Sequence, residues 1–155
     1  MLSKKTQYAF RALTHLVENY NKGPVLISEI SRKKKIPLKF LENILLELKK
    51  EGILESKKGK GGGYALLFPP DQITLGRVIR LMEGPLAPLP CASETAYRKC
   101  DECVDDRFCG TRMVMREVRN AMATILDQTT LAQVCARMDE ARQSAQDGDE
   151  LMFYI

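Results

Sequence analysis

The sequence predicts a mostly α-helical fold with one small β-hairpin. Apolar residues recur at helical spacing in several separate stretches of the 155-residue chain, which indicates short amphipathic helices. One cationic, glycine-rich stretch, "SKKGKGGG" at residues 56–63, lies between two short apolar runs, as in a hairpin. A longer amphipathic stretch begins at residue 111, after a cysteine-rich segment. We therefore expect an N-terminal domain, a loop that carries cysteines, and a long C-terminal helix.

The composition bounds the class of protein. No apolar run approaches the ~20 residues that cross a bilayer, and the start of the chain lacks the apolar region of a signal peptide. We therefore expect a cytoplasmic protein. One histidine, no nucleotide fingerprint and no recognisable pair of catalytic carboxylates give no basis for an enzyme.

The charge is distributed unevenly along the chain. Residues 1–84 carry 16 Lys or Arg against 8 Asp or Glu, or +8, whereas residues 85–155 carry 8 against 12, or −4. This asymmetry favours a polyanionic partner for the first part only, although charge alone fits a solvated cationic face equally well.

The first helix is predicted from "SKKTQYAFRALTHLVENYNKG" at residues 3–23. Ser3 is suited to cap its start, and residues 21–23 supply a stop. His15, the only histidine, is expected to be an ordinary residue of a surface helix rather than a ligand. The apolar stripe consists of Ala9, Ala12, Leu13, Leu16, Val17 and Tyr20.

Two further helices are predicted in close succession. The first, "SEISRKKKI", turns Ile27 and Ile30 inward and ends in four consecutive cations, residues 32–35. The second, "PLKFLENILLELKKEG", has Pro37 at its first position and ends at Gly52. Its buried stripe is expected to be Leu38, Leu41, Ile44, Leu45 and Leu48. Two short helices joined by a tight turn are typical of a helix-turn-helix.

A basic hairpin follows directly. The runs at residues 53–54 and 64–68 flank the glycine-rich turn, and the order of elements over residues 1–84 predicts a winged helix-turn-helix. The glycines do not make a nucleotide-binding P-loop, because Gly63 leads into a strand-like run rather than a helix.

The remainder divides into four parts. Thr74 is predicted to cap a short helix that Gly84 ends, and residues 85–110 form a cysteine-rich loop. Residues 111–145 hold a long helix and a following helix capped by Thr129 or Thr130, and residues 146–155 form a tail. The long helix has an apolar stripe that we interpret as a dimer interface, with intramolecular packing as the alternative. The stripe is Met113, Val114, Val118, Ala121, Met122, Ile125 and Leu126, with Arg112, Arg116 and Arg119 outside it.

A winged helix of this charge is expected to bind double-stranded DNA as a dimer on a pseudo-palindromic operator. Glu42 can accept from a cytosine amino group and Asn43 can read adenine, while residues 32–35 and the wing would contact phosphates. The alternative is a winged helix used for protein contacts. The predicted DNA-binding residues are Lys4, Leu38, Lys39, Phe40, Glu42, Asn43, Lys57, Lys58, Lys60 and Gly61.

Four of the five cysteines lie within 19 residues, in the pattern C-x8-C-x2-C-x5-C. Four thiolates can ligate a structural zinc or an iron–sulfur cluster, and reactive thiols alone can serve as a redox switch. The uneven gaps weaken the case for zinc. We take Cys91, Cys100, Cys103 and Cys109 as the candidate metal ligands, whereas Cys135 is expected to be a buried small hydrophobe.

Over nearly its full length the chain resembles the Rrf-two family of bacterial winged-helix transcription regulators, in its IscR/NsrR-like, cluster-dependent branch. The matching stretches are "LSKKTQYAFRAL", "IPLKFLENILLELKKEGIL", "GKGGGYAL", "ITLGRVIRLMEG" and "ILDQTTLAQV". The resemblance implies a homodimeric repressor or activator with a long dimerisation helix. It also implies three cysteine ligands for an iron–sulfur cluster, of two or four irons, between the wing and that helix.

By position, the resemblance assigns the three ligands to Cys91, Cys103 and Cys109. The chain departs from the family pattern through a longer gap after the first cysteine and through the additional Cys100. A fourth ligand in the family is a histidine three residues after the last cysteine or an aspartate near the N-terminus. Arg112 and Gln7 stand near those places here. Cys100 is therefore the expected replacement.

The sequence thus predicts a regulator whose DNA affinity depends on an iron–sulfur cluster. A cluster-free repressor of the same fold, controlled by thiol oxidation or by a partner protein, is the nearest alternative. A cluster carrier is a more distant alternative, because a carrier has no use for a basic wing.

Overall fold

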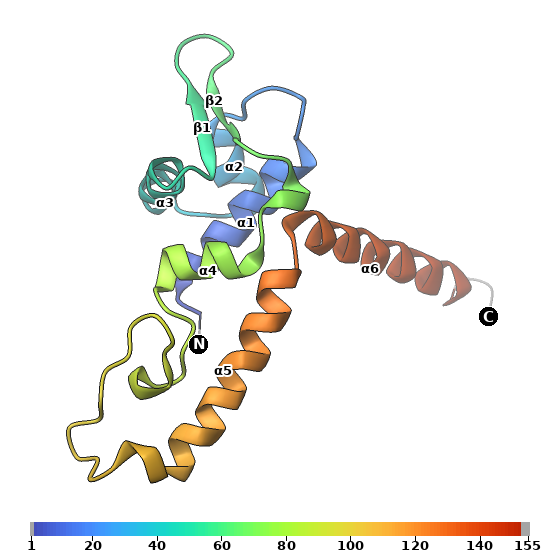
Figure 1. Ribbon diagram of the computed structural model, residues 1–155. Coiled ribbons are helices and arrows are strands. Elements are labelled where there is room, and N and C mark those ends of the chain that lie inside the picture. Colours follow the sequence, from blue (N-terminus) through green and yellow to red (C-terminus); the bar gives the residue numbers. More distant parts are fainter. Residues whose placement is uncertain (1, 153–155) are drawn as a thin grey trace.

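The computed structural model describes residues 2–152 of the chain. A helical domain that carries the β-hairpin forms one end of the molecule, and two long helices extend away from it (Figure 1). The elements of the domain are α1 (Lys4–Glu18), α2 (Ile27–Lys34), α3 (Leu38–Lys50), β1 (Leu54–Lys57), β2 (Gly63–Leu66) and α4 (Leu75–Glu83). The long helices are α5 (Gly110–Gln128) and α6 (Leu131–Met152). The predicted fold class is confirmed.

One hydrophobic core lies among α1, α2, α3, the hairpin and α4. The inward faces of α1 and α3 are buried as their periodicity predicts, through residues such as Leu13, Leu16, Leu41 and Leu45. Leu38 is the exception in the predicted stripe of α3, because its side chain is 46% exposed at the start of that helix.

The turn between α2 and α3 is tight and well anchored. Lys35 adopts a left-handed conformation with φ 52°, which ends α2 and reverses the chain. The Ser31 hydroxyl donates to the Ile36 carbonyl at 2.7 Å, and the Ile36 amide donates to the Ser31 carbonyl at 3.0 Å. Pro37 occupies the N-cap of α3 rather than its first helical position. These contacts fix how α3 projects from the domain.

The hairpin pairs β1 and β2 in antiparallel register, from Leu54 opposite Leu66 to Lys57 opposite Gly63. A bridge between Val25 and Tyr64 adds a third, minimal strand beside β2. Gly63 has φ 140°, and a Cβ there would meet the Val25 carbonyl oxygen at 2.2 Å. Glycine at this position therefore allows the wing to join the domain.

The connection from α5 to α6 is bonded to the start of α4. The Leu75 amide donates to the Thr129 carbonyl, and the Leu131 amide donates to the Ile73 carbonyl, each at 2.9 Å. Leu131 is fully buried in the core. Thr130 and Gln133 cap α6 reciprocally, which decides between the two predicted caps. The C-terminal end of α5 and the N-terminal end of α6 are thereby fixed to the domain.

Helix α6 extends further than the sequence indicated. The predicted tail begins at residue 146, but the helix continues through Met152. Residues 153–155 lie outside the described part of the chain. None of the described helices is both long and apolar enough to span a membrane.

Candidate nucleic-acid interface and cysteine loop

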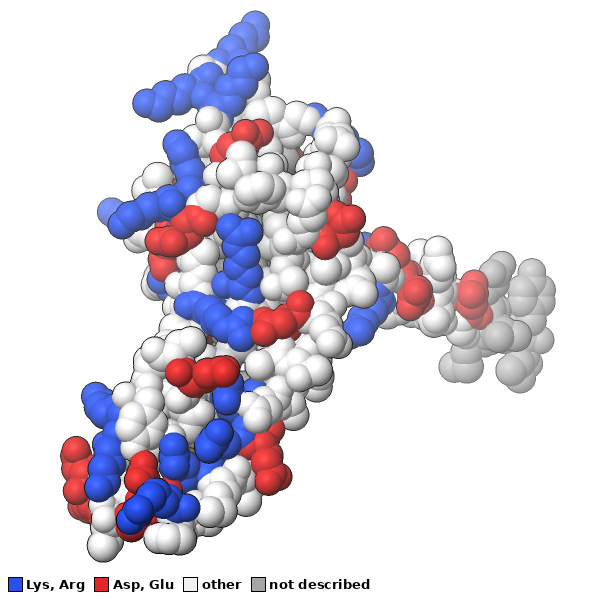
Figure 2. Space-filling view, viewed as in Figure 1, with Lys and Arg blue, Asp and Glu red and all other residues white. Residues whose placement is uncertain are grey.

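The first turns of α3 project from the domain with the residues expected to read DNA. Phe40 is 57% exposed, and Glu42, Asn43 and Lys39 are exposed beside it. The other predicted residues on α1 and the wing, which are Lys4, Lys57, Lys58, Lys60 and Gly61, are exposed as well. Figure 2 shows cationic side chains gathered on the wing and along the edge formed by α3. All ten residues are therefore accessible to a partner.

An aromatic pair next to α3 was not anticipated from the sequence. Tyr8 of α1 packs edge-on against Phe40, with ring centroids 6.3 Å apart. The guanidinium of Arg11 lies 5.6 Å from the centroid of the Tyr8 ring. The pair joins α1 to the exposed side of α3, and helical periodicity within α1 gives no sign of such a neighbour.

Two of the four consecutive cations of α2 are held by ion pairs. Lys33 pairs with Glu29 at 3.1 Å, and Lys34 pairs with Glu18 of α1 at 3.2 Å. Arg32 and Lys35 are exposed. Phosphate contacts from this run are therefore expected mainly from Arg32 and Lys35.

His15 is buried, which corrects the expectation of a surface residue. It is 3% exposed, and its ring nitrogens face the carboxylates of Glu18 at 3.4 Å and Glu29 at 3.2 Å. Asn19 donates to the His15 carbonyl at 2.9 Å. Helix α2 covers the side of α1 that the apolar pattern leaves polar, so His15 is a structural residue between the two helices.

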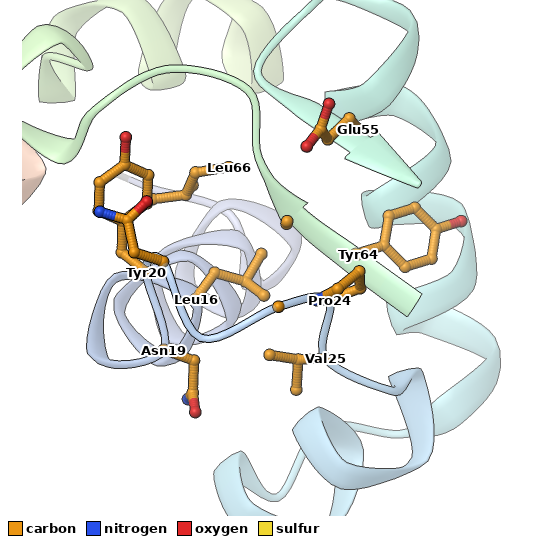
Figure 3. Close-up of a pocket in the computed structure, with 11 residues that line it drawn as sticks. Leu16, Asn19, Tyr20, Pro24, Val25, Glu55, Tyr64 and Leu66 are labelled. Carbon is orange, nitrogen blue, oxygen red and sulfur yellow. The ribbon is translucent and has the colours of Figure 1, made fainter. Parts of the chain in front are cut away.

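A small hollow of about 220 Å³ lies at the base of the wing, between the end of α1 and β2 (Figure 3). Leu16, Val25 and Leu66 line it together with Tyr20, and Glu55 is its one charged lining residue. Ligand sites are typically larger, at roughly 300–1,000 Å³. We assign no ligand to this hollow.

The four clustered cysteines lie on the loop between α4 and α5, as predicted. Two short 3-10 turns, Pro90–Ala92 and Asp106–Phe108, interrupt this loop. Cys100 is exposed, while the other three thiols are partly covered. The tip is open, since Val104 is 97% and Phe108 is 78% exposed. The loop thus has few buried contacts of its own.

Arg112, in the first turn of α5, contacts the loop at several points. Its Nε donates to the Cys91 carbonyl at 2.8 Å, and its Nη1 donates to the Asp106 carbonyl at 3.2 Å. The guanidinium also lies 5.4 Å from the centre of the Tyr97 ring. The Tyr97 hydroxyl donates to the Asp106 carboxylate, which raises the pKa of Tyr97 and lowers that of Asp106. Arg112 therefore joins both halves of the loop.

Arg119 makes a second connection from α5 to the loop, an ion pair with Glu94. The side chains of Arg112 and Arg119 are only 22% and 11% exposed. The expectation that both lie on the outer face of α5 was wrong, because the returning loop covers that face.

The clustered cysteine thiols lie on one loop but do not converge on a common centre. Desolvation raises the pKa of the Cys103 thiol, and the charges of Cys109 and Cys100 raise it further. Cys109 caps α5, with its Sγ accepting from the Arg112 amide at 3.5 Å. Across the described residues, no three Cys, His, Asp or Glu side chains converge in metal-binding geometry.

The donor set nevertheless fits an iron–sulfur cluster chemically. Four thiols on one open loop provide soft anionic ligands, and the Arg112 guanidinium is bonded to the backbone carbonyl of one of them, Cys91. Closure of the loop would be needed to bring the thiols to one centre, and the exposed tip at Val104 leaves room for it.

Helix α5 presents an apolar face that nothing in the described chain covers. Its members are between 37% and 64% exposed, and no residue of α5 is buried. They are Met113, Val114, Val118, Met122 and Ile125. An exposed apolar stripe of this length is typical of an interface with another molecule.

Cys135 on α6 is only half-buried. Its Sγ lies 4.0 Å from the Thr14 carbonyl, and burial raises the pKa of its thiol. It packs against α1, on a different element from the four clustered cysteines.

The fold is that of a winged helix-turn-helix protein, a class that includes DNA-binding regulators. The family model described as "Iron-dependent Transcriptional regulator", Rrf2, matches residues 2–137, and the chain belongs to this Rrf2 (Rrf-two) family.

Relatives and solved structures agree with this assignment. The chain is 36% identical over 150 residues to an rrf2-like HTH-type transcriptional regulator of Rhodobacter capsulatus, covering 95% of this chain and all of that protein. The structure of CymR, the global cysteine regulator of B. subtilis, is 28% identical with a TM-score of 0.74, over 88% of this chain and 97% of CymR. T. potens IscR is 29% identical with a TM-score of 0.72, over 91% of this chain and 90% of that one.

Proposed function

We propose that the protein is a homodimeric, cytoplasmic transcription regulator whose affinity for operator DNA is controlled by an iron–sulfur cluster on the cysteine loop. One observation carries the proposal. The same chain joins an exposed recognition helix and cationic wing to a loop of four thiols, and the loop is bonded to the start of α5. Membership of a family of transcriptional regulators supports the DNA-binding part.

DNA binding would use α3 and the wing together. Glu42 and Asn43, exposed on the first turns of α3, would face base edges in the major groove. Lys57, Lys58 and Lys60 would contact the backbone, so affinity would fall steeply with salt. Phe40 offers an apolar surface to thymine methyl groups.

Dimerisation would use the exposed stripe of α5. A two-fold axis across this helix would cover Val118, Met122 and Ile125 and pair two recognition helices on a pseudo-palindromic site. Affinity for the operator would then depend on the relative orientation of the two α5 helices in the dimer.

The cysteine loop would control the relative orientation of the two α5 helices. An iron–sulfur cluster would supply a thiolate-bound group that is sensitive to oxidants, nitric oxide and iron supply. Cys91, Cys100, Cys103 and Cys109 would hold it, with Cys100 as the fourth ligand. Because Cys109 caps α5, ordering or disordering the loop would move the start of the dimer helix. A structural zinc is a weaker alternative for the same thiols.

Anaerobic purification with visible spectroscopy and analysis of iron, sulfide and zinc tests the cluster. The wild type is expected to absorb near ~400 nm and to contain iron and sulfide. Cys100→Ala should lose most of both, whereas Cys135→Ala, a cysteine on another element, should retain them. Salt-dependent binding to duplexes selected from a random pool tests the DNA-binding part separately.

A thiol switch without a cluster is the second candidate. It is supported by the exposure of Cys100 and by the lack of three converging metal-ligand side chains among the described residues. Similarity to CymR, described as a global cysteine regulator, points the same way. A colourless, metal-free protein whose DNA affinity changes on peroxide treatment would favour this candidate. A colourless protein with about one zinc per chain would make the loop a structural clamp.

A further inference from the structure

Two arginines of α5 lie on one edge of the helix and face the cysteine loop. Arg112 and Arg119 are seven residues apart, which places them on the same side, two turns from each other. Arg112 binds the Cys91 carbonyl and Arg119 pairs with Glu94. These contacts fix residues 91–94 to α5, and a second bond, from Arg112 Nη1 to the Asp106 carbonyl, fixes the segment that leads into Cys109.

The middle of the loop, residues 98–105, has no such hydrogen bond or ion pair to α5. Residues 98–105 are held mainly by contacts within the loop, such as the Cys103 amide donating to the Cys100 carbonyl at 3.1 Å. Val104 is almost fully exposed in this segment. The two ends of the loop are therefore positioned more firmly than its middle.

We propose that Arg112 is the positioning residue of the cysteine loop: before any metal is bound it holds Cys91 and the segment before Cys109 against the start of α5, and Cys100 and Cys103 close onto them. The inference rests on the proposed function for its purpose, but the positioning itself is a property of the metal-free chain. A planar guanidinium suits the task, because its Nε and Nη1 bind two carbonyls in fixed directions.

The chain supplies a matched control on the same loop. Arg107 is exposed, and its ion pair is with Asp105, two residues away at the N-cap of the same 3-10 turn. Removing Arg107 deletes a loop guanidinium without touching the connection between Cys91 and α5. Lysine at position 112 is a second comparison, because a single ammonium keeps the charge but loses the planar pair of donors.

Hydrogen exchange of the reduced, chelator-treated protein tests the positioning without a cluster. The reporters are the amides of Ala92, Ser93 and Arg98, which are bonded to the carbonyls of Leu89 and Pro90. Arg112→Ala and Arg112→Lys should each raise exchange at these amides at least about tenfold. Arg107→Ala should not. Amides of α3 should be unchanged in all variants, which shows that the domain remains folded.

Anaerobic reconstitution of the same variants tests the consequence. Iron per chain should fall in Arg112→Ala and Arg112→Lys but not in Arg107→Ala. Unchanged exchange at the three reporter amides in Arg112→Ala would overturn the positioning role, whatever the iron content. Faster exchange in the Arg112 variants, together with a wild-type protein that binds no iron on reconstitution, would retain the positioning role and refute the cluster function.

Discussion

A glutamate at position 118 is expected to separate the proposed dimer. Val118 lies in the middle of the apolar stripe of α5 and is 39% exposed in the single chain. Complete burial of a valine contributes roughly 1.5–3 kcal/mol, so covering the exposed part contributes about 1 kcal/mol per chain. An unpaired carboxylate in its place adds a desolvation cost of several kcal/mol unless water reaches it.

Two-fold symmetry applies both terms twice, once on each chain. Val118→Glu should therefore weaken the dimer by at least about 4 kcal/mol, or roughly a thousandfold in Kd. Val118→Ala removes apolar area alone and should weaken it less than about tenfold. A much larger increase in the dimer Kd for Val118→Glu than for Val118→Ala would show that position 118 is buried in the interface. Similar, small increases would show that it lies only at the edge of the contact.

Sedimentation velocity at micromolar protein is the assay. The wild type and Val118→Ala should sediment as dimers and Val118→Glu as a monomer. Val104→Glu, which charges an exposed valine away from α5, should remain a dimer. A Val118→Glu protein that is still dimeric would refute the α5 interface, because a twofold-buried carboxylate pair at that position could not be tolerated.

Three further perturbations address the wing, the core and the joint between α1 and α4. Lys58→Gln should weaken binding to all duplexes and reduce the slope of log K against log salt by about 1, measured by fluorescence anisotropy across a salt series. Leu41→Ala empties a fully buried site and should cost about 2–5 kcal/mol in urea unfolding. Hydrogen bonds from Ser3 and Thr6 lower the pKa of Glu83 to about 2 from its usual 4.5. Its stabilising effect should be complete above pH 4.5 and lost as the pH falls towards 2, so the stability difference between wild type and Glu83→Gln should shrink over that window.

The sequence was sufficient for the elements whose faces are decided locally. The stripes of α1 and α3 follow helical periodicity, and Thr74 and Gly84 bound α4 as their residue types indicate. The wing was predictable because glycine and lysine at its turn exclude a core role. These features depend on residues near in sequence, so the pattern alone determines them.

The errors in the predicted burial of polar side chains arise where a distant segment covers them. His15 is buried by the approach of α2 to α1, and Arg112 and Arg119 are covered by a loop that begins more than twenty residues earlier. Periodicity assigns both arginines to solvent because they lie off the apolar stripe. A polar residue can be recognised as buried only once its partners are known.

Helix α5 is the element that brings the two proposed activities of the chain together. One edge carries Arg112 and Arg119 towards the cysteines, and another face carries the apolar stripe. Near its end, Asp127 binds Arg80 of α4 through two hydrogen bonds of 2.5 and 2.9 Å. One rigid helix is thus bonded to the loop at its start and to the DNA-binding domain at its end.

Contacts continue from α4 to the recognition surface. Glu83 accepts hydrogen bonds from the first turn of α1, through the Ser3 amide and the Thr6 hydroxyl. Tyr8, in the second turn, packs on Phe40 at the exposed start of α3. A displacement of α5 would therefore reach the recognition helix through α4 and α1 as well as through the dimer axis. Contacts of this kind give a structural route from α5 to α3, and a double-mutant cycle on Arg80 and Asp127, with DNA affinity as the readout, measures what that pair contributes to it.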